Sequence, residues 1–418
     1  MTAGFLAICM VTAAFCMVGR RLSSTFLTAP MLFLFLGVFL ATSGLVGHET
    51  AEKLLHPVAE VALVILLFLD AAQTDVAALR ERHIWPTRML LIGLPLAIAF
   101  GTLAGIILFP TWPVVAVALA AAILAPTDAA LGQAVVTNPD VPIRPRRALT
   151  VESGLNDGLA LPVVLFFASV TASVDPLIGG GDWLVFGAKQ IILGPIAGIF
   201  VGGLGAWVLL KAKKYKTTSE TYEGIGALAM AGCAYLGADL IGGNGFISAF
   251  VAGLVFGAII KGACKFVYEF TESEGQMLAW VAFLLLGAAL VPEAIQHLTL
   301  PMLGLILVSL FIVRPLAIWI SLMGTDASPI TRIFFGWFGP RGLATALFAL
   351  LVIEQIPDAL GDQVLHLAVN AVWISAVLHG VSAAPAARWY GAKTAEMGQC
   401  PENQDIHVSA KPLVTRHV

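Results

Sequence analysis

The sequence predicts an all-α polytopic membrane protein with about thirteen transmembrane helices. Of its 418 residues, 59% are hydrophobic and 12% are charged, whereas soluble domains carry about 25% charged residues. The mean hydropathy is +0.91, and apolar segments of about 20 residues, the length that crosses a bilayer, recur along the chain. The third observation is the segregation of basic residues between alternate loops, which is typical of multi-pass proteins.

The predicted spans follow one another with short polar connections. In order they cover residues 2–19, 29–47, 57–74, 89–109, 113–136, 148–173, 183–210, 222–240, 245–261, 275–292, 300–322, 331–354 and 363–387. If the N-terminus lies outside, nineteen of the 23 basic residues fall inside and only Lys53 falls in an outer loop. The positive-inside rule therefore predicts an N-out, C-in orientation.

The spans define the expected domain organisation. Residues 1–390 form one membrane domain, and residues 391–418 form a short cytoplasmic tail that we expect to be disordered. The first span lacks a basic leader and a small-residue cleavage site, so we expect a retained helix rather than a signal peptide. The net charge of −3 and the alternating basic loops give no indication of a nucleic-acid partner. The five cysteines show no metal-ligand spacing, and no cofactor or enzymatic activity is predicted.

Two spans carry helix breakers at similar depth. The fifth span is interrupted at Pro126 and the twelfth at Gly339-Pro340. If the seventh span is a linker, the chain contains two six-helix repeats of opposite orientation, in which these two spans correspond. Interrupted helices at corresponding positions of two repeats indicate a transport site near the bilayer midplane.

Ionisable residues lie inside several apolar segments. These residues are Asp70, Asp128, Glu152, Asp157 and Arg314. A charge at the centre of a bilayer costs roughly 2.5–3.5 kcal/mol on insertion scales, so such groups are kept where they meet one another or an ion. Their clustering is the first indication that the protein moves a cation.

The sixth span presents one polar face. Glu152, Ser153, Asn156 and Asp157 fall within an arc of about 140° on a helix. The break of the fifth span adds the side chains of Thr127 and Asp128, and Pro126 is expected to free backbone carbonyls for coordination. Oxygen ligands of this kind suit a hard cation such as Na⁺, Li⁺ or K⁺ rather than zinc or copper. Burial also favours a protonated carboxyl group, so one carboxylate can bind either a proton or an alkali ion.

The remaining polar residues have expected supporting roles. Arg314 needs a counter-charge at similar depth, and Glu152 is the candidate, which leaves Asp157 free to titrate. Asp70 is interpreted equally well as a relay on the cytoplasmic side and as a buried acid near a helix end. Arg341 is expected to neutralise helix-terminal carbonyls at the break of the twelfth span. His379 is expected to be a hydrogen-bonded packing residue rather than a pH sensor.

These motifs resemble a known family. Thr127-Asp128 followed by Glu152-Ser-Gly-Leu-Asn-Asp157, Arg314-Pro-Leu, Gly339-Pro-Arg-Gly342 and the closing His379-Gly run occur in the order found in monovalent cation–proton antiporters. Within this superfamily they resemble the sodium/proton exchanger branch that carries an Asn-Asp motif. The bacterial and archaeal members of this branch are NhaP-like. The resemblance covers about residues 60 to 390.

The resemblance implies a plasma-membrane homodimer with elevator-like movement of a six-helix core. It implies that a Na⁺ ion is held by Asp157, Asp128, Ser153 and Thr127, with support from Asn156 and Glu152. The positions of Arg314, Asp70 and Arg341 add these three as further supporting residues. Because Asn156 is uncharged and Glu152 is expected to pair with Arg314, one-for-one exchange of Na⁺ or Li⁺ for H⁺ is expected.

Three alternatives remain at the level of the sequence. Exchange of K⁺ for H⁺ at the same site is the nearest. A cation channel is the second, because broken helices also line pores. An intramembrane aspartic protease using Asp128 and Asp157 is the third, although neither acid lies in a Gly-x-Gly-Asp context.

Overall fold

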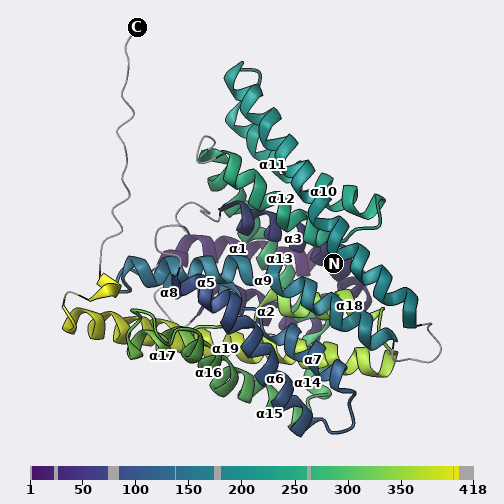
Figure 1. Cartoon of the computed structure of the whole chain (residues 1–418), viewed down its shortest axis with the longest axis vertical. Coiled ribbons are helices and arrows are strands. Elements are labelled where there is room, and N and C mark those ends of the chain that lie inside the picture. Colours follow the sequence, from purple (N-terminus) through teal and green to yellow (C-terminus); the bar gives the residue numbers. More distant parts are fainter. Residues whose placement is uncertain are drawn as a thin grey trace.

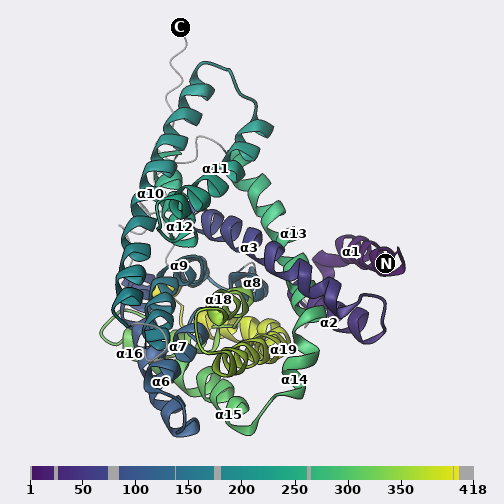
Figure 2. The same ribbon diagram turned by 90° about the vertical axis from the view of Figure 1, so that its right-hand side faces the viewer.

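The computed structural model describes residues 2–22, 27–73, 84–136, 138–173, 180–260, 265–398 and 400–403, all of them in helices or their connections. Figures 1 and 2 show two groups of helices, with α1 (Thr2–Leu22) beside α2. The first group comprises α2 (Ala29–Thr42), α3 (His48–Gln73), α10 (Gly180–Lys214), α11 (Glu220–Leu240), α12 (Gly245–Ile260) and α13 (Lys265–Ala289).

The second group contains the helices that build the polar interior. Its members are α5 (Ile84–Arg88), η1 (Met89–Gly93), α6 (Leu94–Leu108), α7 (Val114–Leu124), α8 (Ala129–Val136), α9 (Ile143–Ser173), α14 (Val291–Gln296), α15 (Leu300–Val308), η2 (Ser309–Val313), α16 (Arg314–Ser321), α17 (Pro329–Trp337), α18 (Leu343–Ile353) and α19 (Asp358–Glu396). The two groups meet where α9 packs on both α7 and α10 and where α3 contacts α9 and α18.

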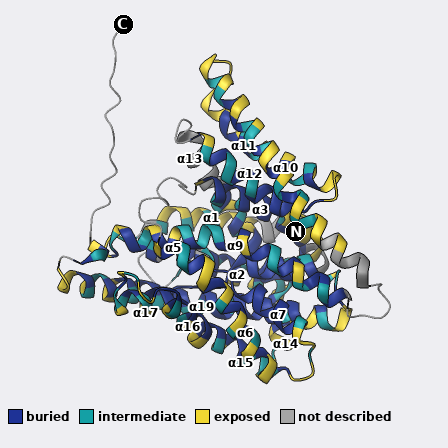
Figure 3. Cartoon of the chain, in the orientation of Figure 1, coloured by how far each residue is buried: buried dark blue, intermediate teal, exposed yellow. Residues whose placement is uncertain are grey.

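The described helices follow the predicted spans and often extend beyond them. Helix α9 begins at Ile143 and α19 runs from Asp358 to Glu396, because polar turns continue the helix past the apolar stretch. Six of the described helices are long and apolar enough to cross a membrane. Apolar side chains such as Ile192, Ile199 and Phe200 lie exposed on α10. Figure 3 shows exposed residues, in yellow, along α10 at the outside of the molecule. This exposure is the pattern of a multi-pass membrane protein, in which lipid covers such faces.

Glycines bring the helices of the first group into backbone contact. On α10, Gly194 faces the backbone of Asn244 just before α12, and Gly198 and Gly202 face the backbone of α12 itself. Gly253 and Gly257 of α12 face the carbonyls of Phe68 and Ala72 on α3. Small residues at this spacing allow close approach of membrane helices. Helix α12 is thereby fixed between α10 and α3, and this contact positions the end of α3 that carries Asp70.

We expect Gly257→Ala to destabilise the protein by about 1–3 kcal/mol, since the added Cβ overlaps the Ala72 carbonyl oxygen and forces the backbones apart. Gly232→Ala on α11 is the matched control, because a Cβ there meets open space. Thermal unfolding in detergent measures both variants. If Gly257→Ala and the unmodified protein had equal melting temperatures, the α3–α12 contact would not require glycine at this position.

The expectation of a disordered tail from residue 391 onward is wrong for its first part. Helix α19 continues to Glu396, and Pro401–Asn403 form a 3₁₀ turn. Buried Glu402 accepts hydrogen bonds from the Ser328 amide at 2.9 Å and from the Thr331 hydroxyl at 2.7 Å. These bonds dock the turn on the start of α17. Residues 404–418 of the expected tail lie outside the described residues.

A second set of bonds secures the same end of the bundle. Arg144 at the start of α9 binds both carboxylate oxygens of Asp326 at 2.7 and 3.0 Å and the Pro401 carbonyl at 3.0 Å. The Trp85 indole N–H donates to Asp326 at 2.7 Å. Partial burial alone raises the pKa of Asp326, but the bonds from Arg144 and Trp85 outweigh it, so the pKa lies below the ordinary 3.8.

Glu402 behaves in the same way. Burial alone raises its pKa, but hydrogen bonds from Thr331 and Ser328 hold the pKa below the ordinary 4.5. A carboxyl group whose pKa is lower in the folded state stabilises the fold above its unfolded pKa and loses this contribution as the pH falls through the folded value.

We therefore expect the melting temperature to drop as the pH falls below about 4. Asp326→Asn should have a lower melting temperature than the unmodified protein at pH 7 and a shallower acid profile, so that the two curves converge at low pH. Thermal unfolding between pH 7 and pH 3 measures this. Parallel curves would contradict a contribution from the Arg144–Asp326 contact.

Candidate functional site

Two helices are broken in the middle of the second group. Residues 125–128 separate α7 from α8, and residues 338–342 separate α17 from α18. Each break contains a proline, Pro126 or Pro340, which has no N–H to continue the helical hydrogen bonds. Both breaks occur where the sequence predicts them.

The two breaks cross and exchange hydrogen bonds. The Asp128 amide donates to the Pro340 carbonyl at 2.8 Å, and the Leu343 amide donates to Asp128 Oδ2 at 2.8 Å. Asp128 thus lies at the N-terminus of α18, where a negative charge is favourable. A Cβ at Gly342 would overlap the Asp128 carboxylate, so this close approach requires glycine.

Arg341 joins the crossing from the other side. Its guanidinium donates to the carbonyls of Ala125 at 2.9 Å and Pro126 at 3.2 Å, and to the Ser309 hydroxyl at 3.1 Å. The prediction that Arg341 neutralises helix-terminal carbonyls at its own break is therefore wrong. It binds the carbonyls that end α7, because the crossing brings them within its reach. The break at Pro126 was expected to leave backbone carbonyls free to coordinate an ion. Instead, the carbonyls of Ala125 and Pro126 accept hydrogen bonds from Arg341.

The structure contains the predicted pair of Glu152 and Arg314. The guanidinium binds both carboxylate oxygens, at 2.7 and 3.1 Å, and both side chains are buried. Arg314 also donates to the Phe338 carbonyl at 3.4 Å. The pair therefore links α9 to the start of α16 and to the break between α17 and α18.

A network of neutral groups adjoins this pair. The Thr127 hydroxyl lies 3.3 Å from Glu152 Oε2 and 3.3 Å from the Ser153 hydroxyl. The Asn156 amide donates to the Thr127 hydroxyl and, at 3.2 Å, to the Thr127 carbonyl. Through these bonds α9 holds the break between α7 and α8.

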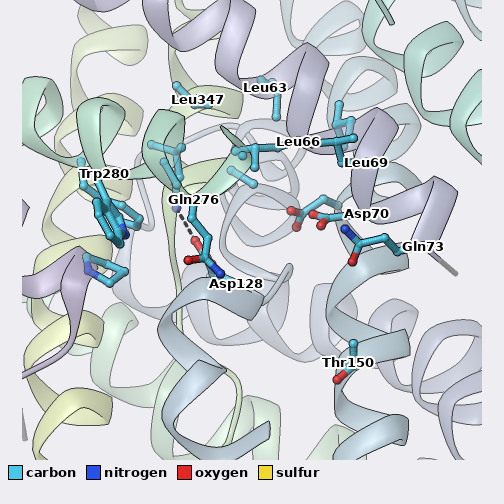
Figure 4. A pocket seen from close by; sticks show the side chains of 18 of the residues that line it. Leu63, Leu66, Leu69, Asp70, Gln73, Asp128, Thr150, Gln276, Trp280 and Leu347 are labelled. Carbon is cyan, nitrogen blue, oxygen red and sulfur yellow. Dashed lines mark hydrogen bonds between the residues drawn. The ribbon is translucent and has the colours of Figure 1, made fainter. Parts of the chain in front are cut away.

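Asp157, Asp128 and Asp70 line one cavity of about 340 Å³. Figure 4 shows Asp70 beside Gln73 and, across the cavity, Asp128 with the bond from the Leu343 amide; Leu63, Leu66 and Leu69 form an apolar wall. The cavity lies between α3 and α13 of the first group and α9, α18 and the α7 break of the second. Oδ1 of Asp157 is buried and has no hydrogen-bond partner among the described residues.

The structure divides the predicted site residues into two sets. Asp70, Asp128 and Asp157 line the cavity, whereas Thr127 and Ser153 belong to the adjoining network and are not among the lining residues. Sequence reasoning missed three polar residues of the wall, which are Gln73, Thr150 and Gln276. Their signal in the sequence is weak, because each is neutral and lies near the end of an apolar stretch.

His379 is a packing residue, as predicted. Nε2 lies 2.9 Å from the Trp337 carbonyl. Nδ1 lies 3.0 Å from the Ser375 carbonyl and 3.1 Å from the Ser375 hydroxyl, which also accepts the Arg341 amide at 2.7 Å. Both ring nitrogens therefore have hydrogen-bond partners inside the bundle. These bonds hold both ends of the 338–342 break.

A family model described as the transmembrane sodium/hydrogen exchanger matches residues 6–389 of the chain. The chain belongs to the sodium/hydrogen exchanger family. This family consists of membrane transporters, and the resemblance found in the motifs is confirmed.

Relatives within the exchanger family are moderately similar. The K⁺/H⁺ antiporter NhaP2 of Shewanella sp. (strain ANA-3) is 28% identical over 366 residues, covering 84% of this chain and 62% of that protein. The Na⁺/H⁺ antiporter 1 of Methanocaldococcus jannaschii is 27% identical over 243 residues, covering 53% of this chain and 52% of that protein. The chain thus spans about three fifths of the length of the former.

The fold of the exchanger family is also seen in a solved structure. The sodium proton antiporter MjNhaP1 from Methanocaldococcus jannaschii superimposes with a TM-score of 0.77 at 19% identity, covering 94% of this chain and 97% of that chain. The all-helical antiporter fold predicted from the sequence is therefore confirmed.

Proposed function

We propose that the protein is a secondary antiporter that exchanges Na⁺ or Li⁺ for H⁺ across the plasma membrane. One observation carries the proposal: the carboxylate of Asp157 lines a cavity together with Asp128, and its buried Oδ1 has no hydrogen-bond partner among the described residues. An unpaired buried oxygen costs about 1–3 kcal/mol. A site that binds either a proton or an alkali ion at this oxygen removes that cost in both states.

The proposed ion ligands are Asp157 and Asp128, with the hydroxyls of Ser153 and Thr127 as neutral oxygens. Asn156 positions Thr127 through two hydrogen bonds. Glu152 is neutralised by Arg314 and does not take part in proton exchange. Asp70, on the opposite wall of the cavity, is the proposed relay for protons entering from the cytoplasm.

The proposed topology has thirteen transmembrane helices, an outside N-terminus and two inverted six-helix repeats. Two π-helical segments support it, η1 (Met89–Gly93) and η2 (Ser309–Val313). Each precedes a proline, Pro95 or Pro315, and each lies in the helix before a broken one. Because π-bulges are rare, their occurrence at corresponding positions supports an internal duplication.

The proposed movement is elevator-like. The cavity lies between the two helix groups, so a shift of the second group against the first would expose it to one side of the membrane and then to the other. In this proposal the first group provides the dimer contacts, and the protein is a homodimer of a bacterial inner membrane.

K⁺/H⁺ exchange is the second candidate. It is favoured by the similarity to proteins named K⁺/H⁺ antiporters over 84% and 88% of this chain. The oxygen ligands are the same for both ions, and selectivity depends on the size and rigidity of the site.

Proteoliposomes containing the purified protein and an internal pH dye test these functions. We expect a preset pH gradient to collapse on addition of NaCl or LiCl. If the pH gradient collapsed with KCl but not with NaCl or LiCl, K⁺ rather than Na⁺ would be the exchanged ion. Cation flux that needs no proton counterflow would indicate a channel and refute exchange.

We also expect one-for-one exchange, because Asn156 is neutral and Glu152 is paired with Arg314. Each turnover then moves no net charge, although 100 mV would contribute about 2.3 kcal/mol per charge to an electrogenic cycle. A K⁺ diffusion potential set with valinomycin should therefore drive no uptake of ²²Na⁺. Accumulation of Na⁺ under that potential alone would disprove the one-for-one mechanism.

A further inference from the structure

A cluster of potential metal ligands lies away from the cavity, where α14 meets α19. It consists of Glu293 on α14, His297 directly after α14, and His366 on α19. One ligand atom from each residue lies within 4.8 Å of the other two. The proposed exchange does not use these residues.

The hydrogen bonds of the cluster select a metal-binding tautomer. His297 Nδ1 lies 3.0 Å from the Glu293 backbone carbonyl. Since a carbonyl only accepts, Nδ1 carries the proton and Nε2 keeps its lone pair. Such a bond from the second ring nitrogen is the usual support of a metal-bound histidine. His366 Nε2 lies 3.7 Å from Glu293 Oε1, and the two imidazole rings are parallel with centroids 4.6 Å apart.

A buried residue fixes the two helices against each other at this point. The Asn370 side-chain amide donates to the Ala294 carbonyl at 2.6 Å and to the His366 carbonyl at 2.8 Å. Ala294 and Asn370 are fully buried. The backbone positions of Glu293 and His366 are therefore set by packing, while the side chains of Glu293 and His297 are exposed.

We propose that Glu293, His297 and His366 form a binding site for a divalent transition-metal ion, with Zn²⁺ as the best fit. Two imidazoles and one carboxylate with an open fourth position are a common zinc ligand set. Zinc bonds of about 2.0–2.2 Å require ligand atoms about 3.4 Å apart in a tetrahedral site. The ligand atoms lie within 4.8 Å of one another, so a bound ion would require the exposed side chains of Glu293 and His297 to turn toward His366. Mg²⁺ and Ca²⁺ prefer all-oxygen sites and fit poorly.

Calorimetric titration of the purified full chain with ZnCl₂ tests the proposal. We expect one Zn²⁺ per chain, no binding of MgCl₂, and at least tenfold weaker binding in His297→Ala and in His366→Ala. The matched control is His56→Ala, which removes another exposed histidine and should leave the affinity unchanged. Co²⁺ in place of Zn²⁺ should give the visible absorption of a tetrahedral site, and His297→Ala should remove it.

Unchanged Zn²⁺ affinity in the His297→Ala/His366→Ala double variant would overturn the site, as would the absence of binding to the unmodified chain. Melting temperatures of the metal-free variants establish that they are folded. The titration involves no transport, so its result is independent of whether the chain exchanges Na⁺, K⁺ or neither.

Discussion

Asp157→Asn should abolish cation-dependent proton flux in proteoliposomes while leaving a folded protein. The substitution preserves the shape of the side chain but removes both its charge and its ability to take up a proton. Asp157 lines the cavity with Asp128 and Asp70, and its Oδ1 makes no hydrogen bond to the described residues, so no structural contact of that oxygen is lost. Dissipation of a pH gradient on addition of NaCl, LiCl or KCl measures the effect.

Two further variants make the Asp157 experiment decisive. Asp140→Asn alters an exposed acid outside the cavity and should exchange ions normally. Asp128→Asn should lose transport and also melt at a lower temperature, because the Asp128 carboxylate accepts the Leu343 amide at the start of α18. Exchange at the unmodified rate by Asp157→Asn would show that this carboxylate is not the titrating group.

Glu152→Gln and Arg314→Met should each destabilise the protein by about 3–5 kcal/mol, because each leaves the charge of the other residue buried and unpaired. Both side chains are almost completely buried, and the pair is bidentate. The double variant should recover part of the loss, since no isolated charge remains. A double-mutant cycle from unfolding in detergent measures the coupling. Strictly additive losses would mean that the pair contributes no interaction energy.

The sequence predicts the helices and their breaks well because both depend on local chemistry. A bilayer requires about 20 apolar residues per helix, and Pro126 and Pro340 cannot donate the hydrogen bonds that continue a helix. The pairing of Glu152 with Arg314 was also predictable, because a buried cation needs a nearby anion. These inferences required only depth in the membrane and charge.

The arrangement at the crossing was not predictable from the sequence. Arg341 binds carbonyls 215 and 216 residues away, and no local pattern indicates which break supplies them. The helical periodicity placed Ser153 and Asp157 one turn apart on the same polar face, but the partner helices decide that, of these two, Asp157 lines the cavity. The extension of α19 to Glu396 depends on the contacts of Thr331 with Tyr390 and Glu402, which are also distant in the sequence.

The crossing of the two breaks has a consequence for the order in which the protein is made. Asp128 receives its hydrogen bond from Leu343, which is synthesised 215 residues later. At about 5–20 residues per second, the first break leaves the ribosome roughly 10–40 s before its partner. During that interval the Asp128 carboxylate lacks the Leu343 amide, and the carbonyls of Ala125 and Pro126 lack the Arg341 guanidinium. Assembly of the crossing is therefore a late step of biogenesis, and a chain that stops before the second break has neither the Leu343 amide nor the Arg341 guanidinium to complete it.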